Sequence, residues 1–303
     1  MASGVLIVSG PTASGKSDLA VALATEFDAE IVGADSRQIY RDMPIGTALP
    51  SPAQREAVPH HLIDFLAPHE RYSAAQFVVD AIAAIDDIHA RGKRAIVAGG
   101  TGFYIRALCG DVHLAPQRDS AIRSRLAREA QLHPPHALFA WLQAIAPERA
   151  AALHEGDAYR TLRALEISLA AREPAAQTAR TLATLRARAI AYRKIYLEID
   201  RAVLAERIVR RTEQMLSRGL LEEAWRLGGS VVAADALGYP QALAYLRGWA
   251  TKDELLHLLA RATRRYAKRQ ETWFRTEPDL QRVRCEQAHA TVAKLARELP
   301  GWN

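Results

Sequence analysis

The chain has 303 residues, of which 49% are hydrophobic and 24% are charged, and this composition excludes disordered, collagen-like and coiled-coil proteins. The longest apolar run, residues 74–85, is interrupted by Gln76 and Asp80 well short of the ~20 residues that cross a membrane, and the first residues lack the basic segment of a signal peptide, so we expect a cytoplasmic protein with no membrane partner. Lysine and arginine number 40 against 34 acidic residues, a formal net charge of +6 that favours a polyanionic partner.

A short apolar run near the N-terminus is followed by a phosphate-binding motif. Residues 5–9 predict a strand and residues 17–27 an amphipathic helix, and Gly-Pro-Thr-Ala-Ser-Gly-Lys-Ser between them matches G-x-x-x-x-G-K-[ST] in the context that this motif requires. Its glycines let successive N–H groups point at phosphate oxygens, and the helix N-terminus adds positive charge. Lys16 would neutralise the terminal phosphate, and the Ser17 hydroxyl is placed to hold Mg²⁺, the cofactor we expect. The predicted phosphate-binding residues are Gly10, Pro11, Thr12, Ala13, Ser14, Gly15, Lys16 and Ser17.

Two further strands lead into loops at the sheet edge where ligands bind in open α/β folds. Residues 30–34 end at Asp35, and because the residues after it do not predict a strong helix, this carboxylate is a candidate for chemistry. A predicted helix over residues 74–90 precedes the strand 95–98, which runs into Gly-Gly-Thr-Gly with Thr101. This loop has no carboxylate to activate a hydrolytic water, so it favours substrate positioning over hydrolysis.

From residue 111 onward the pattern becomes mostly helical. Residues 111–193 are rich in alanine and arginine and predict a helical insertion that contacts RNA and moves relative to the sheet. The strand 195–199 ends at Asp200, which we expect to cap the next helix, and everything after it predicts helix. Strands alternating with helices favour a parallel, doubly wound α/β sheet of the P-loop NTPase type, with residues 1–110 and 194–303 as the two parts of the core.

A basic tract with aromatic side chains lies near the end of the chain. Residues 261–275 hold six basic residues and one acidic residue, with Tyr266, Trp273 and Phe274 among them. A solvated helix face explains such a run equally well, but together with the aromatic side chains it favours RNA or DNA binding. The residues alone therefore leave open a small-molecule kinase that uses ATP and activates a hydroxyl with Asp35, and a non-catalytic RNA-binding protein with a vestigial nucleotide site.

A set of motifs in a fixed order resembles the tRNA dimethylallyltransferases, also called isopentenyl-tRNA transferases. The likeness extends over nearly the whole chain, and its blocks are residues 10–17, 34–40, 43–48, 60–64, 99–104, 160–166, 207–219, 238–239 and 268–275. Members of that family transfer a dimethylallyl group from dimethylallyl diphosphate to the exocyclic amine of the adenosine on the 3′ side of the anticodon, which gives N6-isopentenyladenosine and diphosphate. The resemblance implies that the loop holds the diphosphate of an isoprenoid donor. Prenylation of free adenine nucleotides is a related alternative that would have little use for the basic tract.

The resemblance also implies roles for individual side chains. Asp35 would be the general base for the amine, and Thr101 would orient the amine or the carboxylate. Arg211, on the helix after Asp200, would stabilise the departing diphosphate together with Arg207, which lies one turn earlier on the same face. A solvated arginine stripe is the alternative for this pair. The implied catalytic residues are Asp35, Thr101 and Arg211.

The expected partners are thus the anticodon loop of tRNA and dimethylallyl diphosphate, bound by a monomer. A single-stranded loop lets the target adenosine leave its stack at a cost of about a few kcal/mol or less. Pro240 stands where the family often has a basic residue, and a core position is the alternative for Trp273 and Phe274. The implied tRNA-binding residues are Asp35, Ser36, Arg37, Gln38, Arg123, Tyr159, Arg160, Thr161, Leu162, Arg163, Ala236, Leu237, Gly238, Tyr239, Pro240, Gln241, Lys268, Arg269, Gln270, Glu271, Thr272, Trp273, Phe274 and Arg275.

Overall fold

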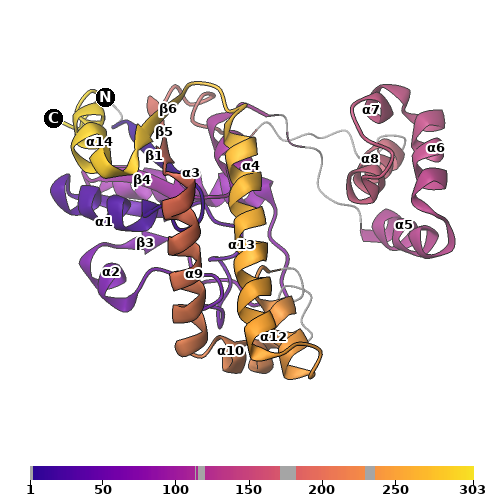
Figure 1. The fold of residues 1–303 in the computed structure, drawn as a ribbon. Coiled ribbons are helices and arrows are strands. Elements are labelled where there is room, and N and C mark those ends of the chain that lie inside the picture. The colour runs from indigo at the N-terminus through magenta and orange to yellow at the C-terminus, as the bar shows by residue number, and fades with distance from the viewer. Residues whose placement is uncertain (1–2, 113, 115–119, 171–181, 229–235) are drawn as a thin grey trace. The chain divides into compact units, whose positions relative to one another are not determined.

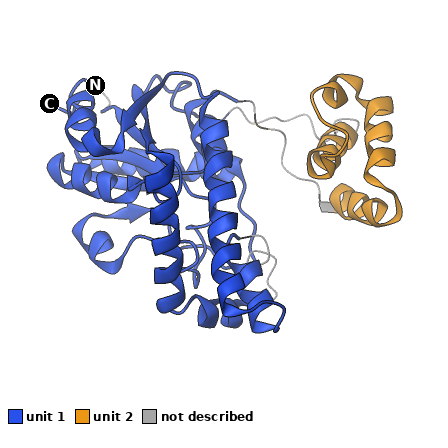
Figure 2. Ribbon diagram, in the orientation of Figure 1, with its two compact units in different colours: residues 1–112, 182–303 blue, residues 113–181 orange. Residues whose placement is uncertain are grey.

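The structure, a computed structural model, describes residues 3–112, 114, 120–170, 182–228 and 236–303. The chain divides into a larger unit, Met1–Val112 with Leu182–Asn303, and a smaller unit, His113–Thr181 (Figure 2).

A parallel sheet forms the centre of the larger unit. Within the described residues, six strands pair in the order β3-β2-β4-β1-β5-β6, and each neighbouring pair runs parallel (Figure 1). All residues of β1 are buried, and because successive side chains of a strand point to opposite faces, the sheet is covered on both faces here. The strands are β1 (Val5–Ser9), β2 (Ala29–Gly33), β3 (His60–His61), β4 (Arg94–Gly99), β5 (Tyr192–Glu198) and β6 (Leu280–Arg284).

Helices connect these strands. None of the described helices is long and apolar enough to cross a membrane. The helices of the larger unit are α1 (Lys16–Glu26), α2 (Pro52–Ala57), α3 (Ala74–Ala90), α4 (Gly102–Cys109), α9 (Arg201–Ser217), α10 (Leu220–Leu227), α12 (Tyr239–Leu246), α13 (Lys252–Phe274) and α14 (Ala288–Ala296).

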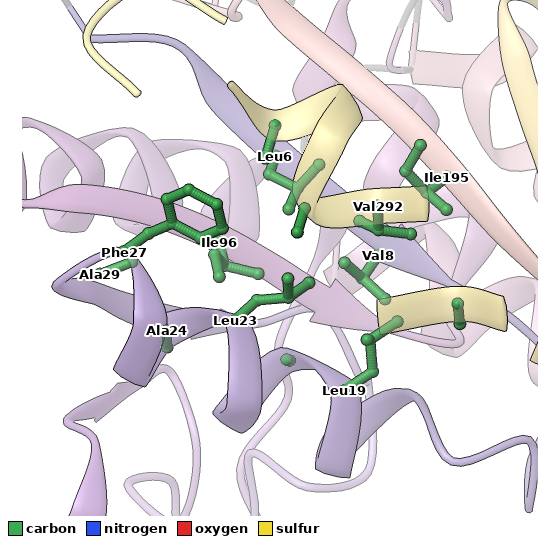
Figure 3. Close-up of a cluster of buried hydrophobic side chains, with 14 of the residues drawn as sticks. Leu6, Val8, Leu19, Leu23, Ala24, Phe27, Ala29, Ile96, Ile195 and Val292 are labelled. Atoms are coloured by element: carbon green, nitrogen blue, oxygen red, sulfur yellow. The ribbon is translucent and has the colours of Figure 1, made fainter. Parts of the chain in front are cut away.

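An apolar cluster between the sheet, α1 and α14 fixes the position of the loop after β1. Leu19 and Leu23 recur at four-residue spacing on α1 and belong to one buried cluster with Leu6 and Val8 of β1, and Val292 of α14 completes it (Figure 3). Such spacing places side chains on one helix face. Because the loop between β1 and α1 is short, this packing determines where its backbone lies.

A second apolar cluster joins segments that are far apart in the sequence. Residues 39–43, which follow β2, pack with helices α10, α12 and α13 through buried side chains that include Ile39, Met43 and Leu259. The loop after β2 and the long helix α13 therefore belong to one packed body, and both contribute to the site described below.

The smaller unit is helical in its described residues. Leu126, Leu142 and Leu165 are buried in an apolar cluster of its own. Its helices are α5 (Ser120–Leu132), α6 (Pro135–Ile145), α7 (Pro147–Ala151) and α8 (Ala158–Ala170).

The predicted strands at residues 5–9, 30–34 and 95–98 are confirmed to within one residue, as is the helix over residues 74–90. The predicted cap is also confirmed, because the carboxylate of Asp200 accepts from the backbone N–H of Ala202 at 2.8 Å.

Two sequence-based predictions are wrong, one of secondary structure and one of a domain boundary. Residues after Asp200 are not all helical, because β6 adds a strand beside β5. Residues 182–193, which we expected in the insertion, belong to the larger unit: the Leu185 N–H donates to the Leu108 carbonyl at 2.9 Å, and β5 begins at Tyr192.

Candidate active site

The loop between β1 and α1 has the curled backbone that its motif predicts. The Ser14 N–H donates to the Pro11 carbonyl at 3.2 Å, and Gly15 has a φ of +90°, a left-handed conformation that glycine adopts without strain. A Cβ at Gly10 would lie 2.8 Å from Ser14 Oγ, so glycine is needed there for close packing. The Ser14 hydroxyl is buried without a hydrogen-bond partner among the described residues. A buried donor of this kind fits a cradle for phosphate oxygens.

A cavity of about 430 Å³ opens beside this loop. Arg207, Arg210 and Arg211 of α9 line it together with Lys16 and Ser17, because the spacing of the arginines places them on one helix face. Arg207 also donates to a carbonyl of the loop at 3.4 Å. The predicted pair of arginines therefore lines the cavity beside the loop, and helical spacing alone would have added Arg210.

Lys16, Arg211 and Asp35 form one cluster of charges. The pKa of Lys16 is lowered to about 8, chiefly by burial and then by the Arg211 guanidinium, against the opposing effect of the Asp35 carboxylate. Burial also lowers the pKa of Arg211, and Asp35 again opposes the change. Two partly buried cations thus lie within electrostatic range of one carboxylate. A multiply charged anion in the cavity would relieve the repulsion between them.

Asp35 and Thr101 follow neighbouring strands and are linked by one backbone segment. The Ser36 N–H donates to Thr101 Oγ1 at 2.9 Å, and the Arg37 N–H donates to Asp35 Oδ1 at 2.9 Å. A Cβ at Gly99 would lie 2.1 Å from the carbonyl oxygen of the residue before Asp35, so only glycine lets the end of β4 approach this segment. The glycine-rich loop therefore serves to place Thr101 beside the chain that carries Asp35.

A loop over residues 43–48 is held from two sides where it approaches the cavity. The Gln38 side chain donates to the Ala48 carbonyl at 2.9 Å, and Ala48 lines the cavity. On the other side, the buried carboxylate of Glu223 accepts from the Gly46 N–H at 2.7 Å and from the Tyr239 hydroxyl at 2.7 Å. Gln38, predicted to contact tRNA, thus also shapes the cavity beside the loop between β1 and α1.

The turn that opens α12 is mostly buried, which corrects part of the prediction for residues 236–241. The side chains of Ala236 and Tyr239 are at most 1% exposed and have no surface for RNA. Leu237 and Gln241 are half-buried, and the Gln241 side chain accepts from the Gly238 N–H at 3.1 Å. Pro240 is exposed in the first turn of α12, where the missing N–H costs nothing.

Helix α13 presents most of its basic tract to solvent. Lys268, Arg269, Thr272 and Arg275 are exposed, and Glu271 is half-buried. A second cavity of about 650 Å³ lies between α9, α13 and the ends of β5 and β6, and its lining includes Lys268. The exposed side chains of the tract remain candidates for contact with a polyanion.

Two predicted RNA contacts on α13 point inward instead. Gln270 and Phe274 are 5% and 1% exposed, so neither side chain has a surface that RNA could contact. Phe274 is instead a core residue that packs on Tyr196, which was the alternative to RNA binding for this position. Trp273 is half-buried under the Arg106 guanidinium, 4.4 Å from the ring centroid.

Tyr266 of α13, which sequence reasoning placed only in the basic tract, interacts electrostatically with Asp35. Its pKa is raised chiefly by burial and then by the Asp35 carboxylate, whereas Arg37, Arg269 and Arg211 lower it. The phenol therefore lies within electrostatic range of Asp35 and Arg211. No local pattern marks this position, because Tyr266 and Asp35 are far apart in the sequence.

The remaining predicted RNA contacts lie in the smaller unit. On α8, Tyr159 and Arg160 are exposed, Leu162 and Arg163 are half-buried, and Thr161 is fully buried, so the side chain of Thr161 has no surface for RNA. Arg123 is half-buried on α5.

Comparisons of sequence and of structure both match this chain to IPP transferases. The family model for IPP transferase matches residues 38–277. A tRNA dimethylallyltransferase 2 of Geotalea uraniireducens is 44% identical over 299 residues, which cover 95% of this chain and 94% of the relative. The tRNA dimethylallyltransferase of Anaeromyxobacter sp. (strain Fw109-5) is 44% identical over 277 residues, 90% of this chain and 92% of that one.

Solved structures agree. The full-length tRNA isopentenylpyrophosphate transferase from Bacillus halodurans superposes with a TM-score of 0.68 at 33% identity, covering 98% of this chain and 97% of that one. A eukaryotic dimethylallyltransferase acting on tRNA has the same fold, with a TM-score of 0.74 at 24% identity. The family model and the relatives both cover most of the chain, and we conclude that this protein belongs to the IPP transferase family.

Proposed function

We propose that this protein is a tRNA dimethylallyltransferase. It transfers the dimethylallyl group of dimethylallyl diphosphate to the exocyclic amine of the adenosine on the 3′ side of the anticodon and releases diphosphate. The observation that carries this proposal is a cluster of charges: Lys16 and Arg211 line the cavity beside the phosphate loop, and the Asp35 carboxylate lies within electrostatic range of both. Such a cluster places a cradle for a leaving group next to a base for a nucleophile.

The loop after β1 and the arginines of α9 would bind the leaving group. The C–O bond between the allylic carbon and the diphosphate breaks, and its electron pair goes to the diphosphate. Lys16, Arg211 and the loop N–H groups stabilise that charge as it develops, which is where preorganised donors lower a barrier most. Ser17 lines the same cavity and would hold Mg²⁺ with one hydroxyl oxygen, which suits an ion that usually takes few protein ligands beside phosphate oxygens and water. Bound Mg²⁺ would add positive charge at the diphosphate.

Asp35 would receive the proton of the nucleophile. As the lone pair of the adenine amine forms the new N–C bond, the nitrogen becomes acidic and its proton passes to the carboxylate. Thr101 Oγ1 accepts from the Ser36 N–H, so Thr101 holds the backbone that carries Asp35 and can orient the amine. The base must leave its stack to reach this position, which favours a loop nucleotide as substrate.

The solvent-exposed basic side chains of α13, which include Arg264, Arg265, Lys268 and Arg269, support RNA as the acceptor. A small free nucleotide would make little use of them. We further propose that the protein acts as a monomer, since one chain carries the phosphate loop, Asp35, Thr101 and Arg211 in a single unit.

The test is to incubate the protein with labelled dimethylallyl diphosphate, Mg²⁺ and total tRNA, digest the RNA and identify the labelled nucleoside. We expect a single labelled product, N6-isopentenyladenosine, from tRNA. Label in free adenine nucleotides, or no label in RNA, contradicts the proposal. Protection against thermal unfolding gives a parallel test: dimethylallyl diphosphate with Mg²⁺ should protect, whereas protection by ATP alone would favour a kinase.

A further inference from the structure

The buried side chain of Gln270 joins two loops of the site. Gln270 lies on α13 and is 5% exposed. Its Oε1 accepts from the Thr12 N–H at 2.8 Å, in the loop that cradles phosphate. Its Nε2 donates to the Gly100 carbonyl at 3.0 Å, in the loop that carries Thr101. One carboxamide therefore bonds both loops, and it uses a donor and an acceptor to do so.

The glycine at position 100 is explained by this contact. A Cβ at Gly100 would lie 2.2 Å from Gln270 Nε2, whereas the next nearest neighbour outside this side chain is 3.7 Å away. Gly100 is not among the glycines with a left-handed backbone, so an alanine could adopt its conformation. The requirement for glycine comes from the carboxamide packed against it.

A second contact one turn later holds α13 to the same segment. A Cβ at Gly102 would lie 2.1 Å from the Trp273 ring, and the Arg106 guanidinium lies over that ring, 4.4 Å from its centroid. Because α13 touches the segment at two glycines, the two contacts together oppose a shift of Gln270 along the helix axis. The carboxamide thus has a defined place between the two loops.

We propose that Gln270 is a positioning residue that sets the separation between the phosphate loop and the loop of Thr101. This inference rests on the proposed function, in which the first loop holds the leaving diphosphate and the second orients the nucleophile. In such a reaction a misplacement of ~1 Å costs about 10²-fold in rate. Gln270 touches neither reacting group, so its loss affects the rate of transfer more than the binding of either substrate.

Three variants and a control separate positioning from mere stability. Gln270→Leu removes both hydrogen bonds. Gln270→Glu keeps both only while its carboxyl is protonated, a form that burial favours. Gly100→Ala displaces the carboxamide without changing it. Gln287→Glu, at an exposed glutamine, controls for the added charge. For each variant we would measure kcat, KM for tRNA, the Kd of inorganic pyrophosphate and the exchange rate of the Thr12 amide hydrogen.

We expect Gln270→Leu to lower kcat by about 10²-fold and to leave KM for tRNA and the pyrophosphate Kd nearly unchanged. The kcat of Gln270→Glu relative to the unmodified protein should fall as the pH rises, and that of Gln287→Glu should not. Gly100→Ala should impair the unmodified chain but add little in a Gln270→Ala background, where the Cβ has room. The Thr12 amide hydrogen should exchange faster once the carboxamide is removed.

A kcat of Gln270→Leu within twofold of the unmodified protein overturns the proposal, as does a loss in Gln270→Glu that does not vary with pH. If Gln270→Leu does not fold, the pH profile of Gln270→Glu and the double variant decide in its place. A protein that transfers no dimethylallyl group refutes the proposed function. The protection of the Thr12 amide then still tests the bridge, and unchanged protection in the folded Gln270 variants would refute it.

Discussion

At the scale of single residues, Asp35 is held by a hydrogen bond that an asparagine at the same position can also form. Its Oδ1 accepts from the Arg37 N–H, and an amide oxygen accepts equally well. We expect Asp35→Asn to slow transfer by about 10²-fold or more, because the base is lost. Inorganic pyrophosphate should bind at least as tightly, since a negative charge near Lys16 and Arg211 is removed.

Single-turnover transfer and calorimetric titration with pyrophosphate measure these two effects. Asp42→Asn, at an exposed position outside the cavity, is the matched control and should change neither. Transfer at an undiminished rate in Asp35→Asn would show that another group takes the proton.

The pKa of Lys16, about 8, predicts a pH dependence of anion binding. A bound diphosphate favours the ammonium form, so affinity should be full below pH 8 and should weaken as the pH rises above it, when the free enzyme loses this proton. Pyrophosphate itself titrates in this range, so the quantity to compare is the difference between the unmodified protein and Lys16→Met. The difference in log Kd should shrink above pH 8, and a constant difference from pH 7 to pH 9.5 would contradict the assignment.

At the scale of elements, a buried acid ties β2 to its neighbours. Glu30 is 2% exposed, and both of its carboxylate oxygens accept hydrogen bonds from the Arg91 guanidinium. The same carboxylate also forms a hydrogen bond with His61 Nε2 at 2.7 Å. The hydrogen bond from Arg91, and next that from His61, lowers the pKa of Glu30 to about 2 against the effect of burial. A carboxyl whose folded pKa is depressed stabilises the fold above its unfolded pKa of ~4.3, and this contribution is lost as the pH falls toward 2.

Glu30→Gln should therefore lower the free energy of unfolding at pH 7 by about 2–3 kcal/mol, and the gap to the unmodified protein should narrow at pH 3. Urea unfolding at both pH values measures it. The control is Glu26→Gln, which removes exposed ion pairs to Arg297 and His289 and should cost less than about 1 kcal/mol at either pH. A gap that does not depend on pH would mean that Glu30 acts by packing alone.

Some strands and helices are predictable from the sequence and others are not. β1 and α1 are predictable because apolar periodicity and the phosphate motif are local. β6 escapes prediction because Val283 is its only fully buried residue, so its pattern looks like a polar segment. The start of β5 escapes because it contains Lys194, which is 1% exposed and neutralised by Asp111 at 2.8 Å and Glu277 at 3.0 Å.

For the site, Lys16, Asp35 and Thr101 could be placed at one sheet edge, because each follows a recognisable strand. Tyr266 and Gln270 could not, because they reach the site from a helix more than 160 residues away from Thr101 in the sequence. Their contacts follow from the packing of α13, which no short motif encodes. Gln270 therefore stood only among the RNA contacts that the family resemblance implies.

At the scale of the whole molecule, the basic face of α13 predicts the salt dependence of tRNA binding. The ion pairs that the described residues form with this part of α13 involve Glu271, with Arg201 and Arg275 as partners, which leaves Arg264 and Lys268 available. The plot of log K against log salt concentration has a negative slope, and each lost phosphate contact makes that slope less steep by about 0.7–0.9. Replacing both with glutamine should reduce the slope by about 1–2 and leave pyrophosphate binding unchanged.

Titration of tRNA binding from low to moderate salt measures that slope. Lys294→Gln, an exposed lysine on α14, serves as the control and should keep the original value. A slope that the double variant does not change would place this helix face outside the RNA interface.

The chain leaves the larger unit and returns to it at adjoining points. A Cβ at Gly110 would lie 2.6 Å from Thr184 Oγ1, and the Leu185 N–H donates to the Leu108 carbonyl at 2.9 Å. A bridge of a few residues between these points would thus close the sheet-bearing unit on itself. We therefore expect that the helical segment between them can be replaced by another insertion, through gene rearrangement or protein engineering, without changing the order in which the strands of the larger unit are connected.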